Sequence, residues 1–181
     1  MGEKDQRGEF KLTPEQAVFL LNYFLPTLRM EFEKTLRLIK AVPADQGAYR
    51  PHPNSRSALE LVWHIASADI WFLDGFLSGK FDMEDDTMPA DISSAADVAL
   101  MYEDQFGPKL DKVAKLPAIF WATPMSFFGI YNFPAVQYLQ FMLNHTIHHR
   151  GQLAAYLRPM GAKVPNIYGG SFDEPMEMPQ E

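Results

Sequence analysis

Three of the five histidines lie within five residues of one another, at positions 145, 148 and 149. On a helix, His145 and His149 are one turn apart and separated by about 40° around the axis, so both imidazoles can bind one metal ion. Apolar residues occupy the same helix face, namely Tyr138, Phe141, Met142, Leu153 and Tyr156. The alternative is a pair of core histidines that hydrogen-bond within the protein, because an unpaired buried nitrogen costs about 1–3 kcal/mol.

His64 is the third candidate ligand. It lies in an apolar segment with helical character, the run Leu61-Val62-Trp63-His64-Ile65-Ala66. Helix bundles build metal sites from side chains on facing helices. Three neutral imidazoles without a carboxylate would leave coordination positions open to water or substrate, as in catalytic sites. A histidine satisfied by hydrogen bonds in the core is again the alternative.

The residues around these histidines exclude two classes of metalloenzyme. A zincin peptidase needs a glutamate directly after its first histidine, where this chain has Thr146. A di-iron carboxylate bundle needs Glu-x-x-His on two helices, but Leu61 stands three residues before His64. The chain has no cysteine, so thiolate ligands and a protein thiol nucleophile are also excluded.

Two further residues of the same helix are candidates for the edge of the site. His148 lies about 60° from His145 on the helical wheel, which favours a supporting position or the pocket rim over ligation. Gln152 lies about 20° from His145 and is a candidate hydrogen-bond donor near the metal.

Three residues outside this stripe are candidates to orient a ligand or to bind substrate. Glu60 is one turn before His64 and can orient its free ring nitrogen, or it can cap the helix with Ser57. Arg150 can bind an anionic substrate, or form a surface salt bridge. Tyr168 lies in a glycine-rich segment that can fold over the site, or it is an exposed turn residue.

Four long helical patterns position these residues. They span about 13–42, 57–78, 94–115 and 134–161, and capping boxes open the first three. One apolar stripe in each pattern predicts an all-α protein, a four-helix bundle with long loops and an irregular C-terminal segment. No strand ladder is evident. The proline- and aromatic-rich stretch 117–134 is expected to pack against the bundle or to cover a partner surface.

The bundle is predicted to occupy residues 13–174, between a flexible N-terminus (1–12) and a disordered acidic tail (175–181). With 181 residues, 47% of them hydrophobic, the chain can form a core without a disulfide or a structural metal. The net charge of −7 argues against nucleic-acid binding. No apolar run is long enough to span a membrane and the first ten residues lack a signal region, so a cytoplasmic protein without membrane contact is expected.

The run from His145 to Tyr168, HTIHHRGQLAAYLRPMGAKVPNIY, closely resembles the C-terminal signature of the DinB-like family, and the Leu-Val-Trp-His context of His64 resembles the family's upstream histidine. The resemblance extends over residues 13–174. It implies a four-helix bundle, usually homodimeric, that binds one divalent metal ion through His64, His145 and His149. The family name refers to damage-inducible expression and does not imply DNA binding, in agreement with the acidic charge.

Relatives of this family include bacillithiol S-transferases and mycothiol-dependent isomerases. The resemblance therefore implies a metal-dependent enzyme that activates water or an external low-molecular-weight thiol for reaction with a small-molecule substrate. The thiol must be external because the chain has no cysteine. Imidazole ligands suit Zn and Ni first, with Fe, Mn and Cu as further candidates. The alternative is a non-catalytic bundle that a metal ion stabilises. Metal-assisted hydrolysis is weakened by the lack of an evident general base beside the ligands.

Overall fold

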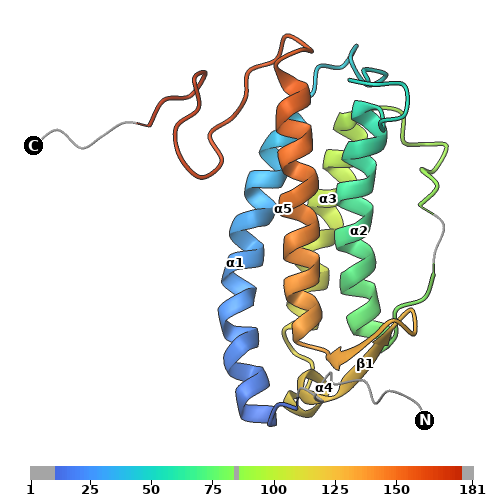
Figure 1. Ribbon diagram of the computed structural model, residues 1–181, viewed down its shortest axis with the longest axis vertical. Helices are drawn as coiled ribbons and strands as arrows, with labels where there is room; N and C mark the ends of the chain where they lie inside the picture. The colour runs from blue at the N-terminus through green and yellow to red at the C-terminus, as the bar shows by residue number, and fades with distance from the viewer. Residues whose placement is uncertain (1–10, 84–85, 177–181) are drawn as a thin grey trace, which may run out of the picture.

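Four long helices form the body of the protein, and three of them begin where the sequence places a capping box (Figure 1). These helices are α1 (Pro14–Lys40), α2 (Ala58–Ser78), α3 (Ala95–Val113) and α5 (Gln137–Leu157). The side chains of Thr13, Ser57 and Ser94 each accept a hydrogen bond from a backbone N–H three residues later. The predicted all-α bundle is therefore confirmed.

The computed structural model describes residues 11–83 and 86–176. Most of the predicted flexible N-terminus and the last five residues of the predicted acidic tail lie outside these ranges. Residues 158–176 contain no long helix and form the irregular C-terminal segment. Within the described part of the chain, no helix combines the length and the hydropathy needed to cross a bilayer.

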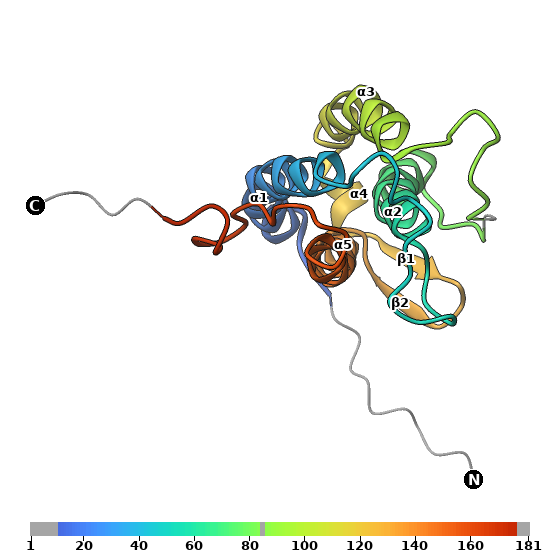
Figure 2. The same ribbon diagram turned by 90° about the horizontal axis from the view of Figure 1, so that it is seen from above.

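The helices occupy the corners of a square, in the order α1, α3, α2 and α5 around the bundle (Figure 2). Side-chain contacts fix their directions: Asp69 contacts Tyr102 and Asp74 contacts Lys109, so α2 and α3 run parallel. The connection 79–94 must therefore return along α2, and its described parts, residues 79–83 and 86–94, lie on the outside of the bundle (Figure 1). This return brings loop residues beside the helix that carries His64.

A small hairpin closes one end of the bundle, a feature that the sequence did not predict. After the short α4 (Ala118–Ala122), β1 (Pro124–Phe127) pairs antiparallel with β2 (Tyr131–Pro134). The turn uses Phe128 and Gly129, both with positive φ. Prolines in a segment argue against a strand, but here Pro124 and Pro134 pair at the open end of the hairpin, where a missing N–H is tolerated. The hairpin packs on the α2–α5 side of the bundle (Figure 2).

Buried polar contacts connect α5 to the other helices. Arg150 is 1% exposed and forms an ion pair with the buried Glu31 of α1. The Thr146 hydroxyl hydrogen-bonds to the buried carboxyl of Asp69 on α2, which also accepts a hydrogen bond from the Tyr102 hydroxyl. Charged and polar groups in a low-dielectric core need such partners. Thr146 and Arg150 are one turn apart, so these contacts fix one face of α5 against the rest of the bundle.

Burial raises the pKa of Asp69 to about 7, although the hydrogen bonds from Thr146 and Tyr102 and the charge of Arg150 lower it. The hydrogen bonds are consistent with a protonated carboxyl. The single Thr146 hydroxyl proton can satisfy the Met142 carbonyl, while a protonated Asp69 donates to the Thr146 oxygen.

Replacing Arg150 with methionine should lower the free energy of unfolding by about 3 kcal/mol, because it removes the fully buried partner of Glu31 and leaves that carboxylate only Lys34 and Tyr168. The matched control is Lys40→Met, which breaks the exposed Lys40–Glu103 pair and should cost less than about 1 kcal/mol. Urea unfolding of the three proteins measures both values. Equal effects of the two substitutions would contradict a stabilising role for the buried pair.

Asp69 should make the protein less stable as pH rises from about 4 to about 7. In this range the unfolded chain has lost the Asp69 proton and the folded chain retains it, so raising the pH favours unfolding by up to about 4 kcal/mol. Asp69→Asn keeps a donor for Thr146 and an acceptor for Tyr102 but cannot titrate. Urea unfolding between pH 4 and 8 should show the variant gaining stability relative to wild type up to about pH 7 and no further. Parallel curves would contradict the raised pKa.

Candidate metal centre

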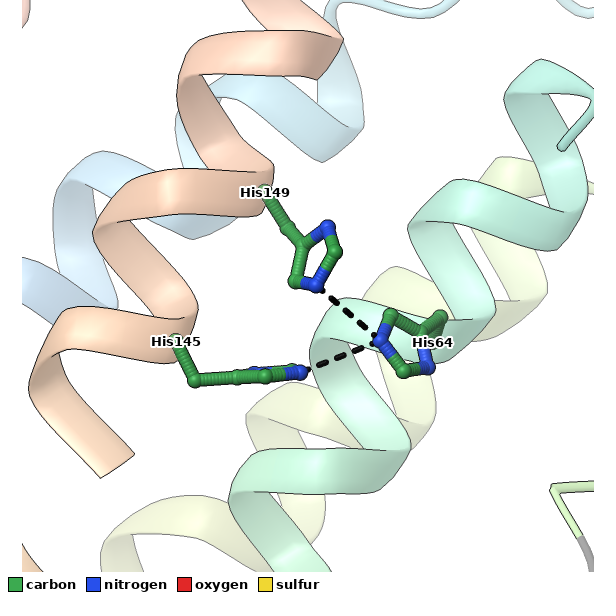
Figure 3. Close-up of side chains that lie close together, drawn as sticks. All are labelled: His64, His145 and His149. Carbon is green, nitrogen blue, oxygen red and sulfur yellow. Dashed lines mark hydrogen bonds between the residues drawn. The ribbon is translucent and has the colours of Figure 1, made fainter. Parts of the chain in front are cut away.

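The imidazoles of His64, His145 and His149 converge from two helices on one point (Figure 3). The Nε2 atom of His64 lies 3.0 Å from Nε2 of His145 and 3.2 Å from Nε2 of His149. Nitrogen ligands of one tetrahedral metal ion lie about 3.3 Å apart, given metal–nitrogen bonds of about 2.0–2.1 Å. The three predicted ligands are therefore arranged as a group that could hold one metal ion.

Hydrogen bonds at the far side of two rings set their tautomers. The Nδ1–H of His64 donates to Oδ2 of Asp86 at 2.7 Å, and the Nδ1–H of His149 donates to Oε1 of Gln152 at 2.9 Å. With the proton on Nδ1, the Nε2 lone pair of each ring faces the common point. Metal-binding histidines in proteins characteristically donate their other N–H in this way, which orients the ring and strengthens it as a ligand.

His145 resists protonation, so a proton is a poor substitute for a metal ion at this ring. Burial, followed by the neighbouring histidines and Arg56, lowers the pKa of His145 to about 3. The pKa of His149 is lowered for the same leading reason. With the proton on Nδ1 of His64 and of His149, the Nε2 lone pairs of these two rings face each other at 3.2 Å, a repulsion that a cation between them removes. The donor set therefore fits a divalent cation that accepts imidazole ligands.

At the far side of the third ring, that of His145, packing takes the place of a hydrogen bond. His145 lies beside Phe72, and its Nδ1 atom is buried without a partner among the described residues. A buried unpaired nitrogen of this kind is uncommon and costs free energy. Such a cost is tolerated where the other nitrogen of the ring makes a strong interaction, which is what ligation at Nε2 would provide.

Asp86 is a residue of the candidate site that the sequence did not identify. It lies on the connection 79–94, and its Oδ1 accepts a hydrogen bond from Ser67 while its backbone oxygen accepts one from the Trp63 indole. Side chains from two adjacent turns of α2 thus hold Asp86 beside His64. The segment 80–91 contains four other carboxylates, so composition alone could not show which one reaches the histidine.

The remaining predicted residues of the α5 stripe lie at the edge of the cluster. Gln152 contacts His149 through its oxygen and His148 through its amide nitrogen, at 3.1 Å from His148 Nε2. His148 is exposed, and its ring packs against that of His149 without joining the convergent group. Gln152 therefore connects a predicted ligand to the polar surface of the protein.

The other three candidates lie away from the cluster. Glu60 forms the capping box with Ser57 and an ion pair with Arg50, so Asp86 occupies the place beside His64 that Glu60 was a candidate for. Arg150 is neither at the surface nor near a pocket, since it is buried against Glu31. The Tyr168 hydroxyl contacts this same ion pair on the α1 side of α5. The sequence of a single helix does not show which of its polar residues will pair with a residue of another helix.

Comparison with known proteins identifies two relatives of similar structure and one of similar sequence. A DinB-like protein from Bacillus cereus ATCC 10987 is 27% identical, with a TM-score of 0.66 over 80% of this chain and 95% of that one. The DinB-like protein YjoA of Bacillus subtilis is 23% identical, with a TM-score of 0.65 over 80% and 96% of the two chains. The uncharacterized protein YrdA of Bacillus subtilis strain 168 is 24% identical over 155 residues, which cover 85% of this chain and 91% of YrdA.

The sequence resemblance described above has an independent counterpart in a family model. The model of the DinB family matches residues 18–181, which include the four long helices except for the first four residues of α1, and the three convergent histidines. Because the match covers nearly the whole chain, this protein belongs to the DinB family.

Proposed function

We propose that this protein is a metal-dependent enzyme in which His64, His145 and His149 bind a divalent cation that activates an external low-molecular-weight thiol. The observation that supports this proposal is the position of the convergent Nε2 atoms at one end of a pocket of about 680 Å³, lined by His64 and His145 among others. A metal that only stabilised the fold would need no such space beside it, so the pocket favours catalysis over the structural alternative.

When bound, the cation would supply Lewis acidity, which lowers the pKa of a thiol or of water. The side chains of the protein would orient the ligands and surround the reacting groups. Asp86 and Gln152 hold the rings of His64 and His149 in the tautomer that binds metal. The apolar side chains of the pocket exclude bulk water, which strengthens electrostatic interactions inside it.

A thiol suits this site better than water. An ordinary thiol has a pKa of about 8.5, whereas water has one of about 15.7, so the thiol requires much less activation. Asp86 is occupied by His64 and Ser67, and no other carboxylate contacts the histidines in the described part of the chain, so no general base for hydrolysis is evident. Free thiols persist in the reducing cytoplasm, where we place the reaction.

The proposed transfer balances without a redox partner. The sulfur of the thiol forms a bond to an electrophilic carbon of the small-molecule substrate, and the leaving group departs with the electrons of its bond. The proton of the thiol is released to solvent.

The predicted homodimer stays a prediction. The exposed residues Phe19, Tyr23 and Met30 lie on one face of α1 and are candidates for its interface.

Purified protein should bind one equivalent of Zn²⁺ or Ni²⁺, and replacing any one of His64, His145 or His149 with alanine should weaken binding at least about 100-fold, because two imidazoles bind far less tightly than three. The matched control is His148→Ala, which removes a neighbouring exposed histidine and should leave the stoichiometry unchanged. Competition with a chromophoric chelator measures these affinities. Full metal content in all three ligand variants would refute the site.

Metal-loaded protein should accelerate conjugation of a low-molecular-weight thiol to reactive electrophiles, and His145→Ala should lower this rate at least about 100-fold because activation of the thiol is lost. Thiol consumption can be followed across a panel of electrophiles, with chelated protein as the blank and His148→Ala as the control. A metal-loaded protein that binds its ion tightly, yet is no faster than the chelated form with any thiol, would favour the non-catalytic alternative.

A further inference from the structure

The pocket beside the three histidines has walls that select for one kind of ligand. We infer that it binds an aromatic molecule that is neutral or positively charged and that it disfavours anions. This inference rests on the proposed function, because the aromatic molecule would be the electrophilic substrate. The binding itself depends only on the pocket.

The pocket is large enough for such a molecule and reaches the reactive end of the site. Its volume of about 680 Å³ falls within the usual range for small-molecule sites. Its lining residues come from α2, from the described part of the connection 79–94, from α3, from the hairpin and from His145 of α5. Because His64 and His145 are among them, a ligand lying in the pocket would contact two of the three convergent histidines.

Stacked aromatic rings form the wall between α2 and the hairpin. Trp71 stacks on Phe128, with ring centroids 5.7 Å apart and planes 21° apart, and Phe72 stacks on Phe127 with centroids 6.0 Å apart. The indole N–H of Trp71 donates to the backbone oxygen of Asp82, so its polar group is already satisfied. Such surfaces favour a flat apolar ligand, and aromatic faces also attract cations.

The backbone at Phe128 is strained in a way that supports a role for this ring. Its φ of 54° lies in the left-handed region, which bulky side chains rarely adopt. The ring is 39% exposed, so core burial does not account for the strain. The turn nevertheless places this ring on Trp71 at the pocket wall. Conformations of this kind are concentrated at functional sites.

The charges of the pocket are negative. Its ionisable lining residues, apart from the two histidines, are Asp74, Asp86 and Asp91, and no lysine or arginine is among the described residues that line it. Asp74 is paired with Lys109 and Asp86 with His64, whereas Asp91 forms no ion pair with a described residue. A cleft with carboxylates and apolar walls attracts cations and repels anions.

Three naphthalene probes with the same ring and different charge test this inference. The probes are 2-naphthylmethylamine, 2-naphthalenemethanol and 2-naphthoate, titrated calorimetrically into the metal-loaded protein and into the same protein after chelation. We expect the amine to bind at least as tightly as the alcohol, and the carboxylate to bind about tenfold more weakly than either in the chelated protein, where it cannot ligate a metal. Absence of binding by all three, or equal binding of carboxylate and amine after chelation, would overturn the inference.

Four variants test whether the probes bind in this pocket. Ala68→Phe fills the pocket from α2 and should weaken all three probes about tenfold or more, whereas Ala155→Phe, on the exposed surface of α5, should change none. Asp91→Asn should weaken the amine about threefold and leave the alcohol unchanged. Phe128→Ala, at an exposed turn, should weaken the binding of every probe about fivefold. This variant replaces Ala68→Phe in the test if Ala68→Phe does not fold. Unchanged affinities in the folded pocket variants would contradict the assignment.

These measurements separate the two proposals. They need neither turnover nor a bound metal, so aromatic binding without thiol conjugation would contradict the proposed function alone. Thiol conjugation that proceeds with anionic electrophiles, while no naphthalene probe binds, would contradict only the substrate class.

Discussion

The contact between Thr146 on α5 and Asp69 on α2 is the constraint on which the rest of the site depends. Asp69 follows His64 by five residues, about 7.5 Å along α2, and Thr146 directly follows His145. One turn further along α5, Arg150 directly follows His149 and is buried against Glu31 of α1. These buried contacts fix both the rotation and the axial position of α5. A helix turned away from this position would lose them, and would also separate its histidines from His64.

The two polar stripes of α5 have different functions because they have different surroundings. The Thr146–Arg150 stripe faces α1 and α2, where its groups are paired internally and contribute to the specific packing of the bundle. The histidine stripe lies about 100° away, beside the pocket and the connection 79–94. There burial lowers the pKa of His145 and of His149, which favours the neutral imidazole, the form that binds metal. The fold thus keeps these two candidate ligands in the protonation state that a metal ion needs.

Local signals in the sequence predicted the helices. The features that the sequence did not predict depend on long-range contacts. The capping boxes at Thr13, Ser57 and Ser94 act within one turn, so they could be recognised directly. The spacing of His145 and His149 likewise follows from helix geometry. By contrast, Asp86 reaches His64 only because the parallel arrangement of α2 and α3 forces the connection back along α2. The internal pairing of Arg150 also depends on another helix, and the hairpin was obscured by prolines that end its strands.

The proposed function requires that the three Nε2 atoms of His64, His145 and His149 bind one divalent cation. A crystal structure of the metal-loaded protein, with diffraction data collected on both sides of the metal absorption edge, tests this directly. We expect one anomalous peak between α2 and α5, about 2.0–2.1 Å from each of the three nitrogen atoms if the metal is zinc. A peak elsewhere, or one at this point with fewer than three histidine ligands, would contradict it.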